Sequence, residues 1–455
     1  MKLLQRPLFT LTSLALLCSM AFASNFGRIY PSEKRQMTDE QTGATLTVLT
    51  EGESSDSKPY QTHTTWTSDH EWIIFRSDRG GNGGQIFIVH EGTGEILQLT
   101  DNPVTNTGSI NLSESDMILY YVRGGRSRDA EEGQERPREL VELDLAKLIP
   151  DARAKKVKEP SAYERVVLTL PEDLRDSGGM ALDPNGKTMY WGVGWETPEQ
   201  KKAREEAAKN PPANAGNSRR DIDSSNTDPN QAREAARKRF EERGRGPGGI
   251  RAIDLKTGKV TKVIDVDLRM GHVQTNPWKS GEIIYCHETT GDAPQRMWTV
   301  QADGSDNRPL YPETEDEWVT HETVASRDEV LFNIMGHLPY LRERPTGIAV
   351  VNLRTNDMKI IGQVEEDLPN GTLGGFWHCN ASPDGKWAVG DTFLGNVFLI
   401  DRETGERILL TTNHKMRPDH THPIFSPDSK RVVIQSGLLS DGEKLDLISI
   451  PVPQR

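Results

Sequence analysis

The chain has few cysteines, few aromatic residues and no long apolar run. Only 3 of its 455 residues are cysteine and 6% are aromatic, which excludes a small domain held together by disulfides. The most apolar stretch, Leu11 to Phe22, is shorter than the roughly 20 residues that a membrane-spanning helix needs. Cys286 and Cys379 follow much later, and the sequence leaves open whether they form a disulfide.

The apolar stretch has the flanks of a secretory signal. Lys2 and Arg6 precede it, and the small residues Ala21 and Ala23 stand at its end, directly before Ser24. This pattern predicts a signal peptide over residues 1–23, cleaved after Ala23. We therefore expect a periplasmic or secreted protein whose mature part, residues 24–455, forms one domain.

Positive charge is scarce as well. The formal net charge is −13, and it becomes −15 when Lys2 and Arg6 are removed with the signal peptide. An acidic protein is a poor partner for nucleic acid or for an anionic membrane surface, because both are negatively charged. An acidic sugar remains a possible ligand where cationic side chains are concentrated locally.

Turn-forming residues are abundant, with 40 glycines and 27 prolines. A turn such as Ser382-Pro383-Asp384-Gly385 precedes an apolar strand, and a second strand follows it. The first strands of the seven such pairs are Trp72-Phe75, Met117-Val122, Thr188-Val193, Glu282-Cys286, Glu329-Ile334, Trp387-Thr392 and Arg431-Ser436. Their partners are Gln85-Val89, Leu140-Leu145, Ile250-Leu255, Arg296-Val300, Gly347-Leu353, Val397-Arg402 and Leu445-Ile450. Seven repeats of a four-stranded unit predict an all-β, seven-bladed β-propeller.

The two ends of the repeat array complement each other. The last repeat ends after its third strand, near Ile450, whereas an additional strand, Ala44 to Thr50, precedes the first repeat. We expect this N-terminal strand to complete the last blade and close the ring. One long polar segment, residues 196–249, interrupts the period, and it is either a solvated insertion or a lid.

Strand polarity assigns each histidine to one face of the propeller. We call the face where the innermost strand of each blade begins the upper face, and the face of its first turn the lower face. Of the 11 histidines, only His70 and His90 fall at the lower face. The upper face receives His63, His272, His287, His321, His337, His378, His414, His420 and His422. This asymmetry predicts an active site at the upper mouth of the central channel.

Some of these histidines suit a metal ion. In an extended segment, His420 and His422 point to the same side, and a third imidazole from another blade, such as His378, would extend the set. A hydrogen-bonded structural role is the alternative, and it is the favoured reading for His63, His337 and His414.

The order of these motifs resembles the oligogalacturonate lyases, seven-bladed propellers of pectin degradation that use manganese to cleave oligouronides by β-elimination. The resemblance runs from about residue 60 to the C-terminus and is strongest from His272 onward. The motifs that carry it are His272-Val273-Gln274, Cys286-His287-Glu288, Gln295-Arg296-Met297-Trp298, His321-Glu322, His378 and His420-Thr421-His422-Pro423.

The resemblance implies roles for particular residues. It makes His378, His420 and His422 ligands of a divalent metal, which is Mn²⁺ in that family, and it makes His321, Arg296 and His287 catalytic. It also places His272 and Gln274 against the substrate. The chain departs from the family at Arg417, where the family has a glutamine that completes the metal shell. A cation at this position repels a metal and attracts a carboxylate, so Arg417 is expected to bind substrate.

β-Elimination on a uronide requires a cation to neutralise the carboxylate and a base of near-neutral pKa. Arg296 suits the first task because a guanidinium binds a carboxylate through two parallel hydrogen bonds. His321 is the first choice as base, and His287 the second. Two alternatives remain: a lyase for another acidic polysaccharide of the ulvan or rhamnogalacturonan type, and a non-catalytic periplasmic binding propeller of the TolB kind.

Overall fold

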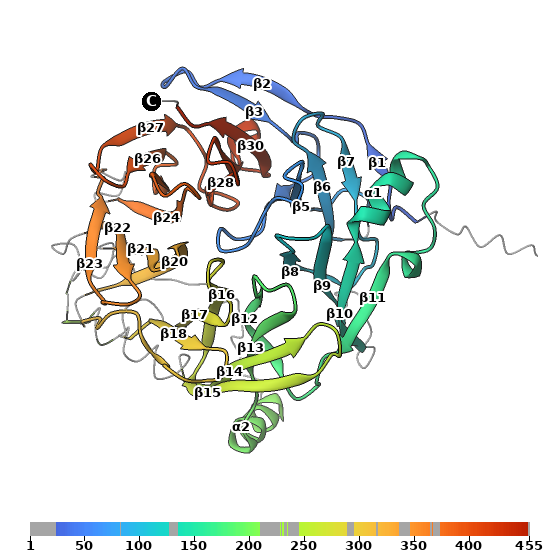
Figure 1. Ribbon diagram of the computed structural model, residues 1–455, viewed down its shortest axis with the longest axis vertical. Helices are drawn as coiled ribbons and strands as arrows, with labels where there is room; N and C mark the ends of the chain where they lie inside the picture. Colours follow the sequence, from blue (N-terminus) through green and yellow to red (C-terminus); the bar gives the residue numbers. More distant parts are fainter. Residues whose placement is uncertain are drawn as a thin grey trace, which may run out of the picture.

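Seven β-sheets are arranged around a central channel in the computed structural model of the chain (Figure 1). The structure describes residues 24–81, 83–126, 135–209, 245–288, 295–314, 317–335, 346–364 and 374–453, with the single positions 228, 230, 231, 234 and 366. The expected all-β, seven-bladed propeller is therefore confirmed. The expected signal peptide, residues 1–23, lies outside the described residues.

Each blade is an antiparallel sheet whose first strand lies nearest the channel. From the channel outward, blade 1 contains β4 (Asp56–Ser57), β5 (Trp72–Ser77), β6 (Gln85–His90), β7 (Ile96–Gln98) and β1 (Ile29–Tyr30). Blade 2 contains β8 (Thr105–Leu112), β9 (Ile118–Arg126), β10 (Glu135–Asp144) and β11 (Glu164–Thr169). Blade 3 contains β12 (Arg175–Leu182), β13 (Thr188–Gly194), β14 (Arg245–Asp254) and β15 (Val260–Leu268). Those of blades 4 and 5 are β16 (Met270–Thr275), β17 (Glu282–His287), β18 (Met297–Gln301) and β19 (Arg308–Pro309); and β20 (Val319–Ser326), β21 (Glu329–Ile334), β22 (Gly347–Asn352) and β23 (Met358–Gly362). Those of blades 6 and 7 are β24 (Phe376–Ala381), β25 (Trp387–Thr392), β26 (Val397–Asp401) and β27 (Arg407–Thr411); and β28 (Ile424–Phe425), β29 (Arg431–Ser436), β30 (Asp446–Pro451), β3 (Thr45–Val48) and β2 (Arg35–Thr38).

The second strand of each blade is apolar on both faces because it is covered by a neighbouring blade on each side. In β5, Ile73 and Phe75 pack with Val433 of blade 7. Their neighbours along the strand, Trp72 and Ile74, pack with residues of blade 2. The continuous apolar runs in the sequences of these strands are thus a consequence of burial on both faces.

The ring closes between the two ends of the chain. Strand β3 pairs with β30, with Thr47 opposite Ser449 and Val48 opposite Ile448. This pairing confirms the prediction that an N-terminal strand completes the last blade. The chain adds two further edge strands, since β2 extends blade 7 and β1 extends blade 1.

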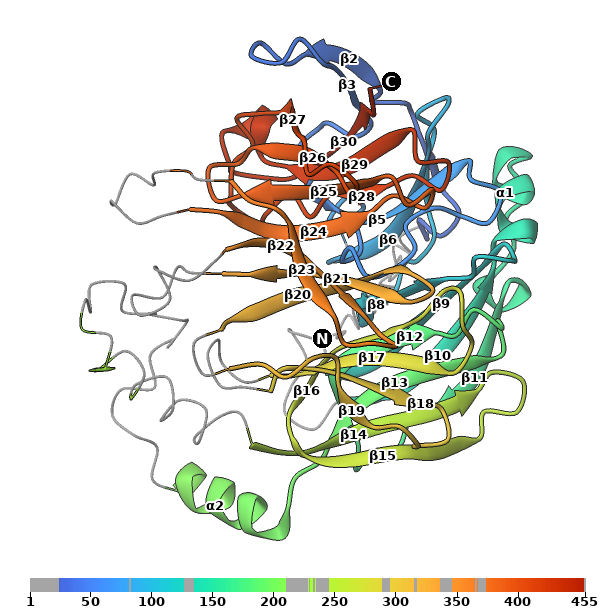
Figure 2. The same cartoon turned by 60° about the vertical axis from the view of Figure 1, so that its left-hand side comes forward.

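The helices α1 and α2, which belong to the described part of the chain, lie outside the ring (Figures 1 and 2). Helix α1 (Leu145–Arg153) follows the third strand of blade 2, and Asp144 caps it by accepting a hydrogen bond from the backbone NH of Lys147. Helix α2 (Pro198–Lys209) begins the polar insertion, most of which lies outside the described residues. No helix among the described residues is long and apolar enough to cross a membrane.

The channel is crossed by a loop of blade 1, residues 58–65, which we call the channel loop. Its Gln61 accepts a hydrogen bond from Asn380 of blade 6 through its backbone oxygen (3.3 Å). His63 hydrogen-bonds through Nε2 to the backbone oxygen of Met180 in blade 3 (2.8 Å). The loop is thus hydrogen-bonded to blades 3 and 6, on different sides of the ring.

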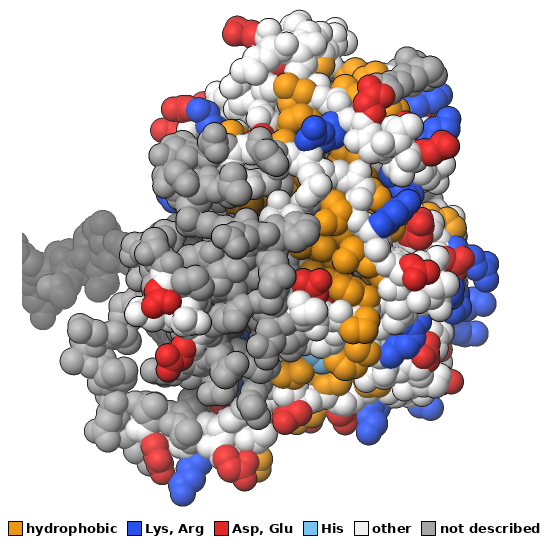
Figure 3. All heavy atoms as spheres, turned by 90° about the vertical axis from the view of Figure 1, so that its left-hand side faces the viewer, with side chains coloured by type: hydrophobic (Ala, Val, Ile, Leu, Met, Phe, Trp, Pro, Cys, Tyr) orange, Lys and Arg blue, Asp and Glu red, His pale blue; other side chains and the backbone are white. Residues whose placement is uncertain are grey.

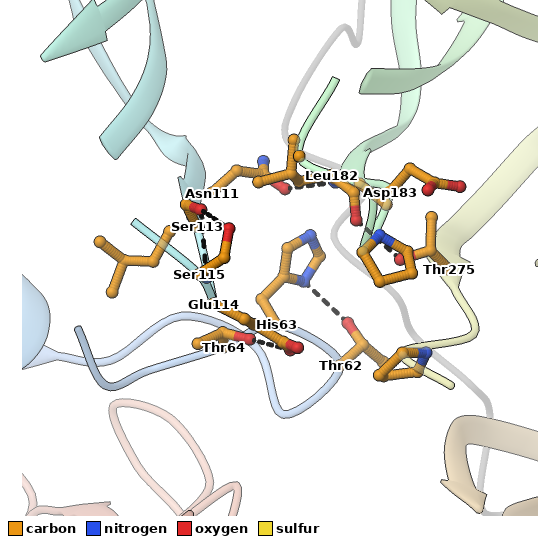
Figure 4. Close-up of a pocket in the computed structure, with 15 residues that line it drawn as sticks. Thr62, His63, Thr64, Asn111, Ser113, Glu114, Ser115, Leu182, Asp183 and Thr275 are labelled. Carbon is orange, nitrogen blue, oxygen red and sulfur yellow. Dashed lines mark hydrogen bonds between the residues drawn. The ribbon is translucent and has the colours of Figure 1, made fainter. Parts of the chain in front are cut away.

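His63 does not lie at the upper face, contrary to the sequence prediction. It lines a small cavity of about 50 Å³ together with first turns of blades 2 and 3, including Ser113 and Asp183 (Figure 4). These turns belong to the lower face. The prediction was wrong because strand polarity does not account for a loop that enters the channel.

Two other sequence questions are answered by side-chain positions. Cys286 and Cys379 are both buried and free, so the permitted disulfide is absent from the described residues. His414 is buried and hydrogen-bonds to Ser436 (2.7 Å) and Thr411 (3.1 Å), which is the structural role expected for it. His337 lies outside the described residues.

Ring closure is expected to depend on Leu46, a fully buried residue of β3 that packs with Ile448 and Ile450. Leu46→Ala should lower the free energy of unfolding by about 2–5 kcal/mol, because it leaves a cavity at the joint. Urea unfolding measures this change. Leu394→Ala is the matched control, because Leu394 is 40% exposed and its truncation should cost far less. Equal losses in both variants would contradict the importance of the joint.

Candidate active site at the upper mouth of the channel

Five histidines from four blades meet above the channel loop. His272, His321 and His378 lie in the innermost strands β16, β20 and β24, and His420 and His422 directly precede β28. The ring centres of His321 and His378 are 4.3 Å apart, and those of His378 and His422 are 3.9 Å apart. Imidazoles from His321 to His422, 101 positions apart in the sequence, therefore belong to one cluster, as the strand-polarity argument predicts.

The innermost strands bulge where they carry these histidines. The pairing register shifts between Gly271 and Gln274 in β16, and between Thr320 and Thr323 in β20. His272 and His321, within the two bulges, have φ angles of 44° and 56°. Residues other than glycine rarely adopt this left-handed backbone conformation, because it costs of order 1–3 kcal/mol. Such strained residues are concentrated at functional sites. The bulges redirect the two imidazoles.

Asp391 organises the candidate metal ligands. Its carboxylate lies 3.2 Å from Nδ1 of His378 and accepts hydrogen bonds from the backbone NH of His378 (2.7 Å) and from the Thr421 hydroxyl (2.7 Å). A hydrogen bond at Nδ1 leaves the lone pair on Nε2 for a metal, as in many carboxylate–histidine–metal arrangements. Ligand atoms of His378, Asp391 and His420 lie within 4.8 Å of one another.

The donor set fits a divalent metal. Burial, together with the adjacent His422, lowers the pKa of His378 to about 3, so this imidazole is neutral and able to bind a metal at neutral pH. Burial also lowers the pKa of His420, and its Nδ1 is buried without a hydrogen-bond partner among the described residues. A buried nitrogen without a partner is costly unless a ligand completes it.

A second group of ionisable side chains lies beside the candidate metal ligands. His272 is 3.3 Å from the fully buried carboxylate of Glu322 and 3.9 Å from that of Glu288. Glu288 is also 3.8 Å from the guanidinium of Arg296. His272, Cys286 and Glu288 offer ligand atoms within 4.8 Å of one another, but Arg296 already supplies a positive charge here. The positive charge of Arg296 beside these ligand atoms disfavours a metal ion in this group.

The two predicted bases differ in their surroundings. His321 hydrogen-bonds through Nδ1 to the backbone oxygen of Trp377, and burial and the neighbouring His378 hold its pKa well below the usual value. His287 lies against Trp298, with ring centres 4.9 Å apart, and neither of its nitrogens has a hydrogen-bond partner among the described residues. Burial lowers the pKa of His287 to about 4. Both imidazoles are therefore neutral at pH 7.

Two residues that were predicted to contact the substrate, Gln274 and Arg417, have different surroundings. Gln274 is buried, and its amide donates to the backbone oxygen of Glu322 (2.9 Å) and accepts from the backbone NH of Val324 (3.3 Å), which joins blade 4 to blade 5. The side chain of Arg417 is exposed and forms no hydrogen bond or ion pair with a described residue. It therefore does not occupy the space among the histidines.

Tyr60 and Gln61, which were not predicted from the sequence, contact the histidines from the channel loop. The ring of Tyr60 lies 5.4 Å from that of His272 and 5.2 Å from that of His422. Gln61 is 3.1 Å from Nδ1 of His422 through its side-chain oxygen. Asp391 was missed as well, because it ends an ordinary apolar strand. No periodicity in the sequence marks any of the three residues.

The pKa of His272 is expected to depend on Glu322. Burial alone lowers this pKa, but Glu322 and Glu288 raise it more, so the net shift is upward. Protonation of His272 therefore stabilises the fold below pH 6.5, and this contribution is lost as the pH rises through the folded-state pKa. Glu322→Gln should move the His272 pKa below 6.5 in an NMR titration. Glu329→Gln, a change at an ion pair with Arg402, should leave it in place.

Metal affinity is expected to depend on Asp391. Asp391→Asn should weaken Mn²⁺ binding roughly 10- to 100-fold, because His378 loses the carboxylate that orients its ring. Calorimetric titration of chelator-treated protein measures the affinity. Asp267→Asn, at an exposed position of β15, should bind like the wild type. Unchanged affinity in the Asp391 variant would exclude this role.

No protein-family model matches the chain. Oligogalacturonate lyase from Dickeya dadantii (strain 3937) is 26% identical over 217 residues, which cover 44% of this chain and 54% of the relative. Oligogalacturonide lyase from Pectobacterium atrosepticum is 24% identical over 220 residues, with the same two coverages. The chain thus spans about half the length of the curated relatives it matches.

Solved structures show the same fold over the whole ring. An oligogalacturonate lyase in complex with manganese superimposes with a TM-score of 0.69 and 21% sequence identity, covering 94% of this chain and 98% of that one. The resemblance carried by the sequence is thereby confirmed: the chain is similar in sequence to oligogalacturonate lyases, and it has the fold of one of them.

Proposed function

We propose that the chain is a lyase that cleaves short uronic-acid oligosaccharides, with oligogalacturonate as the substrate, by β-elimination. The observation that carries the proposal is the position of His321, a neutral imidazole between the His378, His420 and His422 cluster and the group containing Arg296. The names of the similar proteins support the same reaction. The products would be 4,5-unsaturated uronides.

The chemistry requires positive charge at the carboxylate of the reacting sugar. Arg296 is the proposed partner of this carboxylate, since its Nε is buried without a hydrogen-bond partner among the described residues. His378, His420 and His422 would hold a divalent cation, which we take to be Mn²⁺. When bound, this cation supplies further positive charge that stabilises the carbanion formed next to the carboxylate.

His321 is the proposed base. Its Nδ1–H donates a hydrogen bond to the backbone oxygen of Trp377, so Nε2 carries the lone pair. Nε2 takes the proton from C5 of the uronide, a double bond forms between C4 and C5, and the C4–O bond breaks. The departing oxygen takes a proton from water and leaves as a hydroxyl group. His287 is the second candidate, but its ring packs against Trp298 and Tyr285.

The remaining expectations belong to the same proposal. His272, held between Glu322 and Glu288, and Gln274 would shape the wall of the substrate site. Arg417 is exposed, so it would meet substrate at the rim rather than complete a metal shell. Periplasmic or secreted location remains a prediction from residues 1–23.

A lyase acting on another acidic polysaccharide, of the ulvan or rhamnogalacturonan type, is the second candidate. The exposed cation at Arg417 favours it, because the resembling family has a glutamine at that position. Product release from a panel of uronides distinguishes the two substrates.

Digestion of short oligogalacturonates with the protein and Mn²⁺ should give products that absorb in the ultraviolet. His321→Ala should slow this reaction roughly 100- to 10,000-fold, which is the usual contribution of a general base. His90→Ala, at the lower face, should retain the wild-type rate. Folded wild-type protein that releases no absorbing product from any uronide would refute the lyase proposal.

A further inference from the structure

We propose that Arg76 and Lys58 of blade 1 form a second carboxylate-binding subsite, which holds the uronate next to the one that reacts. The inference rests on the proposed function. It concerns a part of the channel mouth that the sequence did not indicate and that lies across the ring from Arg296, since blades 1 and 4 face each other over the channel (Figure 1).

The two cations lie side by side. Ser57 of β4 is paired with Arg76 of β5, and a guanidinium nitrogen of Arg76 donates a hydrogen bond to the backbone oxygen of Lys58. Lys58 begins the channel loop, two residues before Tyr60. The cations are therefore attached to the same loop whose tyrosine contacts the active-site histidines.

One side chain connects this pair with the candidate metal ligands. Gln435 accepts a hydrogen bond from the backbone NH of Lys58 (3.1 Å), and it donates to the backbone oxygen of His420 (2.9 Å) and to Asp419 (3.0 Å). Lys58 and His420 are thus separated by a single glutamine. An oligosaccharide bound at the histidines would reach the Arg76 and Lys58 pair with its next sugar.

Neither cation has an anionic partner among the described residues. The ammonium group of Lys58 is fully buried and donates only to the backbone oxygen of Pro59 (3.2 Å), and Nε of Arg76 is buried without a hydrogen-bond partner. Arg79, on the same side of blade 1, shows the usual arrangement, because it forms ion pairs with both Glu33 and Asp56. Buried charges are ordinarily paired, since leaving them unpaired is costly.

The nearest acidic groups are already engaged. Asp391 is bound to His378 and Thr421, and Asp419 accepts hydrogen bonds from Gln435 and from the backbone NH of His420. Burial and the adjacent Arg76 lower the pKa of Lys58 to about 7, which is consistent with a missing counter-charge. A bound anion would supply this charge.

A carboxylate is the anion that fits both the site and the substrate. A guanidinium binds a planar carboxylate through two parallel hydrogen bonds, and every sugar of an oligouronide carries one carboxylate. Elsewhere on the described surface, the side shown in Figure 3 has acidic and basic side chains interspersed. Arg296 on one side of the mouth and Arg76 on the other would make the site selective for two adjacent uronates.

The test compares two di-uronides, one with both carboxylates free and one whose non-reacting carboxylate is methyl-esterified. In the wild type, esterification should raise KM roughly 10- to 100-fold, which is the usual effect of losing a hydrogen bond to a charged group. Arg76→Gln should raise KM for the free di-uronide by a similar factor, leave kcat nearly unchanged, and remove the discrimination between the two substrates. Arg76→Lys should restore part of it.

Arg35→Gln is the matched control, because Arg35 forms an exposed ion pair with Glu51 at the outer edge of blade 7. It should behave as the wild type, and thermal melting of all variants shows that they are folded. Arg76→Gln that still discriminates like the wild type would overturn the subsite. Calorimetric binding of the same two di-uronides gives the same comparison without turnover, so an inactive wild type would refute the proposed function and leave this inference testable.

Discussion

The contact of Tyr60 with the imidazoles of His272, His378 and His422 is the interaction on which the upper mouth depends. A ring of seven blades leaves an open centre, and the channel loop fills it. Because the loop is bonded to blades 3 and 6, it fixes the distance between histidines that no single blade could position. The site is therefore a property of the closed ring, and β3, which closes it, supports the chemistry from a distance.

Burial has opposite consequences in the two halves of the site. Near Asp391 it keeps the imidazole of His378 neutral, which suits a metal ligand. Near Glu322 the carboxylate outweighs burial and favours the protonated form of His272. Burial and the adjacent His422 thus outweigh Asp391 at His378, whereas Glu322 and Glu288 outweigh burial at His272. The left-handed backbone at His272 and His321 is strained, and the rest of the fold must stabilise it for these two rings to be held in place.

The chain as a whole is acidic, but two buried cationic side chains lie at the mouth of its channel. Its net charge of −13 indicates no anionic ligand, yet Lys58 and Arg296 are buried at one mouth. Lys58 forms no ion pair with a described residue, and Arg296 has Glu288 at 3.8 Å. Enclosure makes each charge more effective, because the surrounding protein screens less than water does. Net charge is a sum over the whole chain, so it does not show which charges line the channel.

The sequence by itself determined the seven blades, the closure by Thr45–Val48 and the gathering of His272, His321, His378, His420 and His422 at one face. Apolar runs and turns repeat along the chain, and strand polarity follows from them. Only the tertiary structure decided the position of His63, the hydrogen bonds of Gln274, and the placement of Tyr60, Asp391 and Arg76. These depend on a loop crossing the channel and on contacts between blades, and contacts between distant segments leave no periodic pattern in a sequence.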